Sequence, residues 1–149
     1  MKVVIQRVSE ASVKVDDKIV GKVSKGFMLL IGVDENDEQQ DADWLIQKIL
    51  NLRVFGDKDD KLNLSIKDIN GEILCISQFT LLADYKKGNR PSFIKAAKPP
   101  KAIPLFEYFK EELAKSGLKV ESGIFGADMK VSLINDGPVT IVMDSITKN

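Results

Sequence analysis

The chain has 149 residues, 44% hydrophobic and 30% charged, a composition typical of one globular domain spanning residues 1–149. Its 22 Lys and Arg side chains balance 22 Asp and Glu, so any contact with nucleic acid is expected to be local or transient. It has no histidine and one cysteine, which excludes a Ser-His-Asp triad, a Cys-His pair, an HExxH zinc site and an intrachain disulfide.

The first third of the chain predicts a β-hairpin and then a buried strand. Residues 3–15 alternate between apolar and polar, and Asp16–Lys18 predicts a turn. Residues 19–23 are then expected to form the second strand of the hairpin. Residues 27–33 form a continuous apolar run after a glycine, which is typical of a buried strand. Neither this run nor the alternating N-terminus resembles a membrane span or a signal peptide, so we predict a cytoplasmic protein without membrane contact.

The middle of the chain predicts a helix and a second apolar strand. Apolar residues recur at helical spacing up to Arg53, and Asp37 is the expected N-cap. Asp57, Asp59 and Asp60 do not make a complete calcium loop, because the glycine and the distal glutamate are misplaced, so a solvated turn is predicted. The apolar strand covers residues 72–79, and its Cys75 is expected to be a buried hydrophobe.

The last third predicts a basic loop, a helix and two strands. The loop, residues 84–92, is equally consistent with an ordinary charged loop and with an RNA backbone contact. The helix is centred on residues 105–113, and strands at 129–133 and 139–143 flank a turn. Because hairpins outnumber crossovers, we predict an α+β fold: a mainly antiparallel, barrel-like sheet with two amphipathic helices.

Two short segments are chemically unusual. Ser77-Gln78-Phe79-Thr80 places two hydroxyls and an amide at the end of an apolar strand, although a plain polar strand terminus is an adequate explanation. Asn135–Pro138 has the composition of a hairpin turn. Its Gly137–Pro138 bond could also be cis, since cis costs only about 0.5–1 kcal/mol before proline.

Both segments resemble motifs of the D-aminoacyl-tRNA deacylase family, SQFTL at 77–81 and NxGPxT at 135–140. The likeness also covers the first 15 residues, the GNRPSF segment and the FGADMKVSLINDGPVT segment, so it extends over essentially the whole chain. The resemblance implies a hydrolase that needs no metal or organic cofactor and cleaves D-aminoacyl-tRNA, and also glycyl-tRNA. It further implies a homodimer with active sites at the subunit interface.

The resemblance also implies roles for individual residues. The wall that carries catalysis would be formed by Ser77, Gln78, Phe79 and Thr80. The substrate would be bound by Gly137, Pro138, Arg7, Asn135 and Met129. Within that set, Gly137–Pro138 would carry a cis bond and enter the partner's pocket, and Arg7 would support the loop.

The implied mechanism uses the RNA itself. The ribose 2′-hydroxyl would assist attack on the ester, and backbone N–H groups near Phe79 and Thr80 would stabilise the oxyanion. A nucleophilic Thr80 stays open, although no general base is evident. Carbonyls of Gly137 and Pro138 would hold the substrate ammonium so that an L side chain meets the pocket wall. Two other hypotheses are a non-catalytic RNA-binding module of the same fold and, less favoured without histidine, a metal hydrolase.

Overall fold

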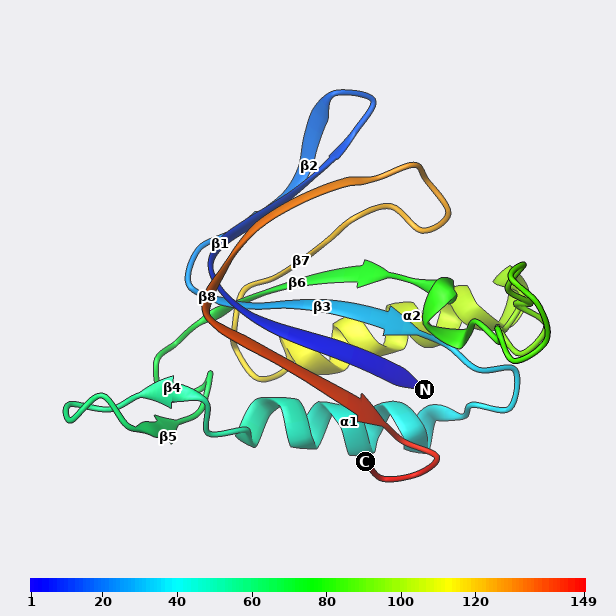
Figure 1. Cartoon of the computed structure of the whole chain (residues 1–149). Helices are drawn as coiled ribbons and strands as arrows, with labels where there is room; N and C mark the ends of the chain where they lie inside the picture. The colour runs from blue at the N-terminus through cyan, green and yellow to red at the C-terminus, as the bar shows by residue number, and fades with distance from the viewer.

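The computed structural model describes residues 1–149 and shows a strongly curved sheet with two neighbouring helices against one face (Figure 1). The strands of the sheet are β1 (Lys2–Val15), β2 (Lys18–Val23), β3 (Gly26–Gly32), β6 (Glu72–Ser77), β7 (Val120–Ser122) and β8 (Lys130–Asp144). A separate hairpin is formed by β4 (Phe55–Gly56) and β5 (Leu62–Leu64). The helices are α1 (Gln39–Asn51), α2 (Pro99–Ala114) and the short 3-10 helix η1 (Phe79–Leu82).

Strand β1 is the centre of the sheet. It pairs antiparallel with β2, β3 and β8, whereas β3–β6 and β6–β7 are parallel pairs. Parallel neighbours need a crossover, and α1 and α2 provide the two crossovers that the sheet contains. The predicted α+β fold, with two helices and a barrel-like, mainly antiparallel sheet, is confirmed. Neither helix is long and apolar enough to cross a membrane.

Apolar side chains cover both faces of β3 and β6, which explains their uninterrupted hydrophobic sequences. On one face, Phe27 and Cys75 belong to the main core of 23 buried residues beneath the helices. On the other face, Met28 and Leu74 belong to a second core of seven residues inside the curve of the sheet. Burial raises the pKa of the Cys75 thiol to about 12. The interpretation of this cysteine as a buried hydrophobe is confirmed.

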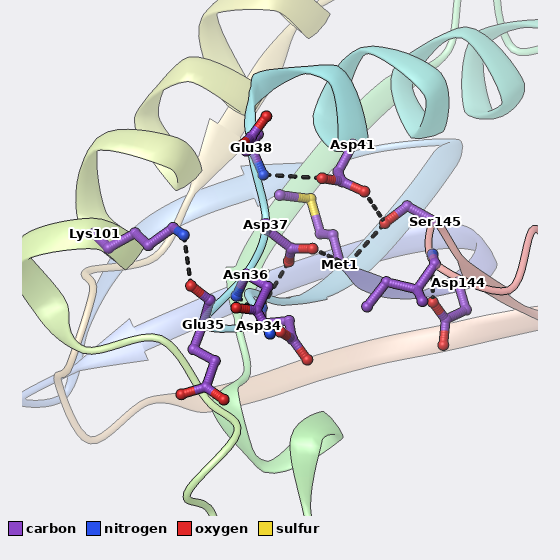
Figure 2. Close-up of polar contacts among 11 residues, drawn as sticks. Met1, Asp34, Glu35, Asn36, Asp37, Glu38, Asp41, Lys101, Asp144 and Ser145 are labelled. Atoms are coloured by element: carbon purple, nitrogen blue, oxygen red, sulfur yellow. Dashed lines mark hydrogen bonds and ion pairs between the residues drawn. The ribbon is translucent and has the colours of Figure 1, made fainter.

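The predicted N-cap of α1 was wrong by one residue. Glu38 is the N-cap and forms a capping box with Asp41, whereas Asp37 is buried beneath the helix start. The Asp37 carboxylate accepts from the α-ammonium of Met1 at 2.6 Å, and Ser145 Oγ lies 2.8 Å from the same nitrogen (Figure 2). Desolvation raises the pKa of Asp37, and the hydrogen bonds that its carboxylate accepts from the Met1 ammonium and the Asp34 N–H oppose the rise. A buried ammonium requires such a partner, so Asp37 neutralises a charge instead of capping a helix.

The segment from 129 to 143 was predicted as two strands around a hairpin turn, and this was wrong. One long strand, β8, pairs with β1 on both sides of the supposed turn, at Val8↔Asn135 and Gln6↔Thr140. The chain does not reverse, because residues 136–139 bulge out opposite Arg7 alone and then rejoin the same partner strand. The Gly137–Pro138 peptide in this bulge is cis, as predicted.

Three smaller elements also differ from the predictions. Strand β6 ends at Ser77, two residues early, because η1 begins at Phe79. The acidic turn at 57–60 is exposed or half-buried, as expected, but it connects the unpredicted hairpin β4–β5. Strand β7 was missed because it has three residues, all half-buried.

Candidate active site

A mainly apolar cavity of about 270 Å³ opens beside the end of β6. Ser77, Gln78 and Phe79 form one wall of it, and Met129 lies on another. The remaining lining residues come from β3 and β6, from the end of the loop before α2 and α2 itself, and from the segment that leads into β8: Ile31, Val33, Ile76, Ala97, Ala102, Phe106, Phe125, Gly126, Ala127, Asp128 and Val131. The structure therefore brings four of the predicted site residues together, and Thr80 follows directly after them.

The polar wall is held in place by the neighbouring strand β3. Ser77 is in register with Ile31, and the Gln78 N–H donates to the Ile31 carbonyl at 2.8 Å. Gly32 then allows η1 to approach, since a Cβ there would lie 2.7 Å from Leu82 and 3.0 Å from the Gln78 carbonyl oxygen. The turn from strand into η1 thus depends on a glycine that sequence analysis did not single out.

The start of η1 presents backbone donors. As the first two residues of a helix, Phe79 and Thr80 have N–H groups without an acceptor inside that helix, and neither donates to a turn, loop or side-chain oxygen. The Thr80 hydroxyl accepts a hydrogen bond from the Gln78 side-chain amide. The hydroxyl therefore contacts a donor, and it donates no hydrogen bond to a side chain that could act as a general base. Phe79 is 56% exposed, and its ring packs edge-on against Phe93.

The other predicted site residues gather at the bulge of β8. Arg7 Nε donates to the Asp136 carbonyl at 2.8 Å, and its Nη1 donates to the Val54 carbonyl at 2.7 Å. Asn135 spans the bulge, because its Oδ1 accepts from the Val139 N–H and its Nδ2 donates to Thr140 Oγ1, both at 2.8 Å. The predicted support of the Gly137–Pro138 loop by Arg7 has a direct geometric basis.

Gly137 fits this bulge for a steric reason. Its φ is +143°, and a Cβ would lie 2.9 Å from Val139 Cγ2 and 3.0 Å from Arg7 Nη2. A side chain at this position would displace either the arginine or the strand, so the glycine allows Arg7 to approach the loop closely.

The cavity and the bulge lie apart within one chain. Arg7 is in register with Phe27 on β3, and Phe27 is in register with Ile73 at the start of β6. Ser77 lies four residues further along β6, which corresponds to about 13 Å along the strand, in addition to the spacing between the strands. Figure 1 shows the same separation, with the bend of β8 and the η1 end of β6 at opposite ends of the strands.

Two cavity residues that sequence analysis missed are aromatic. Phe106 and Phe125 pack edge to face with ring centroids 6.1 Å apart. Phe106 belonged to the apolar face of the predicted second helix, but the pattern of a helix does not distinguish core from cavity. The structure contains no group of three or more His, Cys, Asp or Glu side chains that could hold a metal ion.

Comparison with known proteins gives consistent results. The family described as D-Tyr-tRNA(Tyr) deacylase matches residues 4–144. Proteins named D-aminoacyl-tRNA deacylase from Flavobacterium psychrophilum and Flavobacterium johnsoniae are 62% and 56% identical, covering 99% and 97% of both chains in each pair.

Two solved structures share the fold. One, named c-Myc DNA Unwinding Element Binding Protein, superimposes with a TM-score of 0.90 at 41% identity, covering 97% of this chain and 98% of its own. Another, described as a probable eukaryotic D-amino acid tRNA deacylase, has a TM-score of 0.81 at 17% identity, over 95% and 97% of the two chains. At that identity the second likeness concerns the fold alone.

Proposed function

This chain belongs to the D-Tyr-tRNA(Tyr) deacylase family, and we propose that it hydrolyses the ester bond of D-aminoacyl-tRNA, releasing the free D-amino acid and tRNA. It is an enzyme of the carboxylic ester hydrolase class. The biological role that follows is proofreading: removal of amino acids of the wrong hand before they reach translation. We further propose that the protein acts in the cytoplasm, where charged tRNA is used.

The observation that carries the detailed proposal is the division of the site into two parts. The cavity supplies donors and an apolar wall, the bulge supplies a backbone loop held by Arg7 and Asn135, and within one chain they lie at opposite ends of the strands. We infer a homodimer in which the Gly137–Pro138 loop of one subunit enters the cavity of the other. In support, β8 pairs only with β1, so its other edge is open, and it exposes 53% of Ile134 and 64% of Val142.

In the proposed reaction, water attacks the ester carbonyl carbon. The ribose 2′-hydroxyl of the substrate receives the proton from water and passes it to the departing 3′-oxygen as the acyl C–O bond breaks. The N–H groups of Phe79 and Thr80 stabilise the oxyanion, an effect worth roughly 3–4 kcal/mol per donor in other enzymes. The protein mainly positions the ester, which explains how hydrolysis proceeds without histidine.

Selectivity follows from the backbone of the loop. Carbonyls of Gly137 and Pro138 bind the ammonium of the substrate, and the third substituent on the chiral carbon then decides the outcome. A D side chain is directed to solvent, whereas an L side chain collides with the cavity wall near Met129. Glycine has no side chain, so we expect glycyl-tRNA to be cleaved as well.

Subunit complementation tests this arrangement. Met129→Trp fills the cavity, Arg7→Ala releases the loop, and each homodimer should lose D-Tyr-tRNA hydrolysis. After the two variants are unfolded, mixed and refolded, a heterodimer contains one site with both native parts. Random pairing should then restore about a quarter of native activity. If each site is formed within one subunit, mixing restores nothing and the cross-subunit site is wrong.

Two controls separate the alternatives. Native protein that binds D-Tyr-tRNA but releases no tyrosine is a binding module, not the proposed hydrolase. Native activity that disappears with EDTA and returns with one metal ion would overturn the metal-free mechanism. D-Tyr-, L-Tyr- and glycyl-tRNA are compared throughout, and cleavage of the L-ester at the rate of the D-ester would remove the proposed chiral filter.

A further inference from the structure

Positive charge is concentrated in one surface segment. Residues 84–101, called the basic strap below, contain six Lys or Arg and one acidic residue. The remaining 131 residues contain 16 cationic and 21 anionic side chains, so a neutral chain consists of a strap of net charge +5 and a body of net charge −5. The six cations of the strap are Lys86, Lys87, Arg90, Lys95, Lys98 and Lys101.

These cations are not neutralised by acidic side chains, and only Lys101 has another partner, because its Nζ donates to the Glu35 carbonyl oxygen (Figure 2). All six are exposed, and none of them forms an ion pair with a carboxylate. In contrast, Lys110, Lys115, Lys119 and Lys130 each pair with a Glu or Asp. The strap therefore presents uncompensated charge, while four lysines of the body are neutralised locally.

The strap is fixed beside the cavity. It begins two residues after η1, and its Ala97 lines the cavity. Asp84 and Ser92 exchange two backbone hydrogen bonds of 2.8 Å, which close the tip of the strap into a loop. Further along, the Ala97 N–H donates to the Val33 carbonyl at 2.9 Å, and the Lys95 carbonyl accepts from the Glu35 N–H at 2.8 Å. Figure 1 shows this green loop projecting beyond the carboxyl end of β6.

An exposed aromatic side chain accompanies the charge. Tyr85 has 75% of its surface exposed, directly before Lys86 and Lys87. Aromatic rings interleaved with cations are typical of surfaces that hold single-stranded nucleic acid, because the bases stack while the cations contact phosphates. A free-standing phosphate would need only the cations, so the tyrosine favours a polynucleotide.

We propose that the basic strap binds the acceptor end of the tRNA, with Lys86, Lys87 and Arg90 on its phosphates and Tyr85 stacked on a base of its single-stranded 3′ terminus. This inference rests on the proposed function, which places the aminoacyl ester in the adjacent cavity. It also explains how a chain of zero net charge handles a polyanion: a local patch binds the end of the RNA, and the acidic body leaves the rest of it unbound.

The test compares two esters of D-tyrosine: D-Tyr-tRNA and D-tyrosyl-adenosine, which has the ester and the ribose but no phosphate. The strap variant is K86Q/K87Q/R90Q. The matched control, K58Q/K61Q/K67Q, removes three lysines around the β4–β5 hairpin that are also exposed and form no ion pair. The strap variant should lose at least about tenfold in kcat/KM on D-Tyr-tRNA, and the salt dependence of tRNA binding should flatten by about two to three in log–log slope. Hydrolysis of D-tyrosyl-adenosine should stay within about twofold of the native rate, since it has no phosphate to lose.

Each result decides the question. Equal losses in the strap and control variants would indicate general charge attraction and overturn the assignment. Equal losses on both esters would indicate damage to the cavity and also overturn it. Failure of the native protein to hydrolyse either ester would refute the proposed function. The strap can still be tested in that case, by fluorescence anisotropy with 3′-labelled tRNA. The proposal then requires that K86Q/K87Q/R90Q binds this tRNA more weakly than the control variant does.

Discussion

The cavity and the β8 bulge hold their shape in opposite ways. The cavity is hollow and lined mostly by apolar side chains, and its polar wall, from Ser77 to Phe79, belongs to a chain segment changing from strand to 3-10 helix. The bulge protrudes, and its geometry is set by the Arg7 guanidinium, the Asn135 amide and a glycine without room for a Cβ. In the proposed dimer, the cavity of one subunit would accommodate the ligand, and the bulge of the other subunit would be inserted beside it.

This difference indicates where tolerance to substitution should lie. Many side chains form the cavity wall, so the remaining ones should largely preserve the shape of the cavity when one side chain is lost. The bulge is held by only a few specific contacts, so the loss of one of them should change the position of the loop. Because displacement of a reacting group by about 1 Å can cost 10²-fold in rate, the bulge should be the more sensitive part. The following predictions rank substitutions on this basis.

The largest effect is expected from Gly137→Ala. The added methyl carbon would lie 2.9 Å from Val139 Cγ2 and 3.0 Å from Arg7 Nη2, inside van der Waals contact, at a φ that favours glycine. Hydrolysis of D-Tyr-tRNA should fall by about 100-fold or more while the protein stays folded. Gly117→Ala is the matched control, since Gly117 also has positive φ but nothing within 4 Å of its Cβ. If both variants retain equal activity, the crowding at the bulge has no functional meaning.

A smaller effect is expected from Asn135→Ala. It removes two hydrogen bonds that span the bulge, and each contributes about 1 kcal/mol to stability. We expect roughly tenfold lower activity and a lower melting temperature. Asn135→Asp keeps the acceptor for the Val139 N–H and loses only the donor to Thr140, so it should fall between native and Ala. An Asp variant worse than Ala would show that the acceptor does not hold the loop.

A still smaller effect is expected from Thr80→Ala. The hydroxyl contacts the Gln78 amide and no base, and the backbone N–H that we assign to the oxyanion remains. Activity should decrease by no more than about tenfold. A loss of several orders of magnitude in a folded protein, or a trapped acyl ester on Thr80, would make this residue the nucleophile and refute the RNA-assisted mechanism. Thr80→Ser serves as the conservative control.

No effect is expected from thiol reagents. Cys75 is fully buried one residue before Ile76 of the cavity, and burial raises its thiol pKa to about 12. At pH 8 only about one thiol in 10⁴ is ionised, so iodoacetamide should neither label nor inactivate the native enzyme. Labelling in urea, read by mass spectrometry, is the positive control. Rapid inactivation of the folded enzyme would place a reactive thiol in the cavity.

Features set by local residue chemistry could be predicted from the sequence. The period of the apolar residues predicted both helices and most of the sheet, and the surroundings of Cys75 predicted an inert thiol. The Gly137–Pro138 sequence, together with its family resemblance, led to the cis bond. These predictions needed no knowledge of which strands pair.

Features set by distant contacts could not be predicted. Asp37 was expected to cap α1 because it lies just before the helix in the sequence. Its actual partner, the Met1 ammonium, is far away in the sequence, so no local pattern could reveal it. The turn-like Asn135–Pro138 segment belongs to a continuous strand, and only the pairing with β1 on both sides reveals this. The separation of cavity and bulge likewise follows from the register of three strands, and no local pattern encodes that register.

The pairing of β1 with β8 also has a consequence for how the chain acquires its structure. Residues near the start of the chain pair with residues near its end, and such distant pairings form slowly because a long loop must close first. Until β8 arrives, one edge of β1 is open, with the apolar Val3, Ile5 and Val8 around it, which is a template for association with other chains. We therefore expect pulsed hydrogen exchange during refolding to protect the β3–β6 amides before the β1–β8 amides.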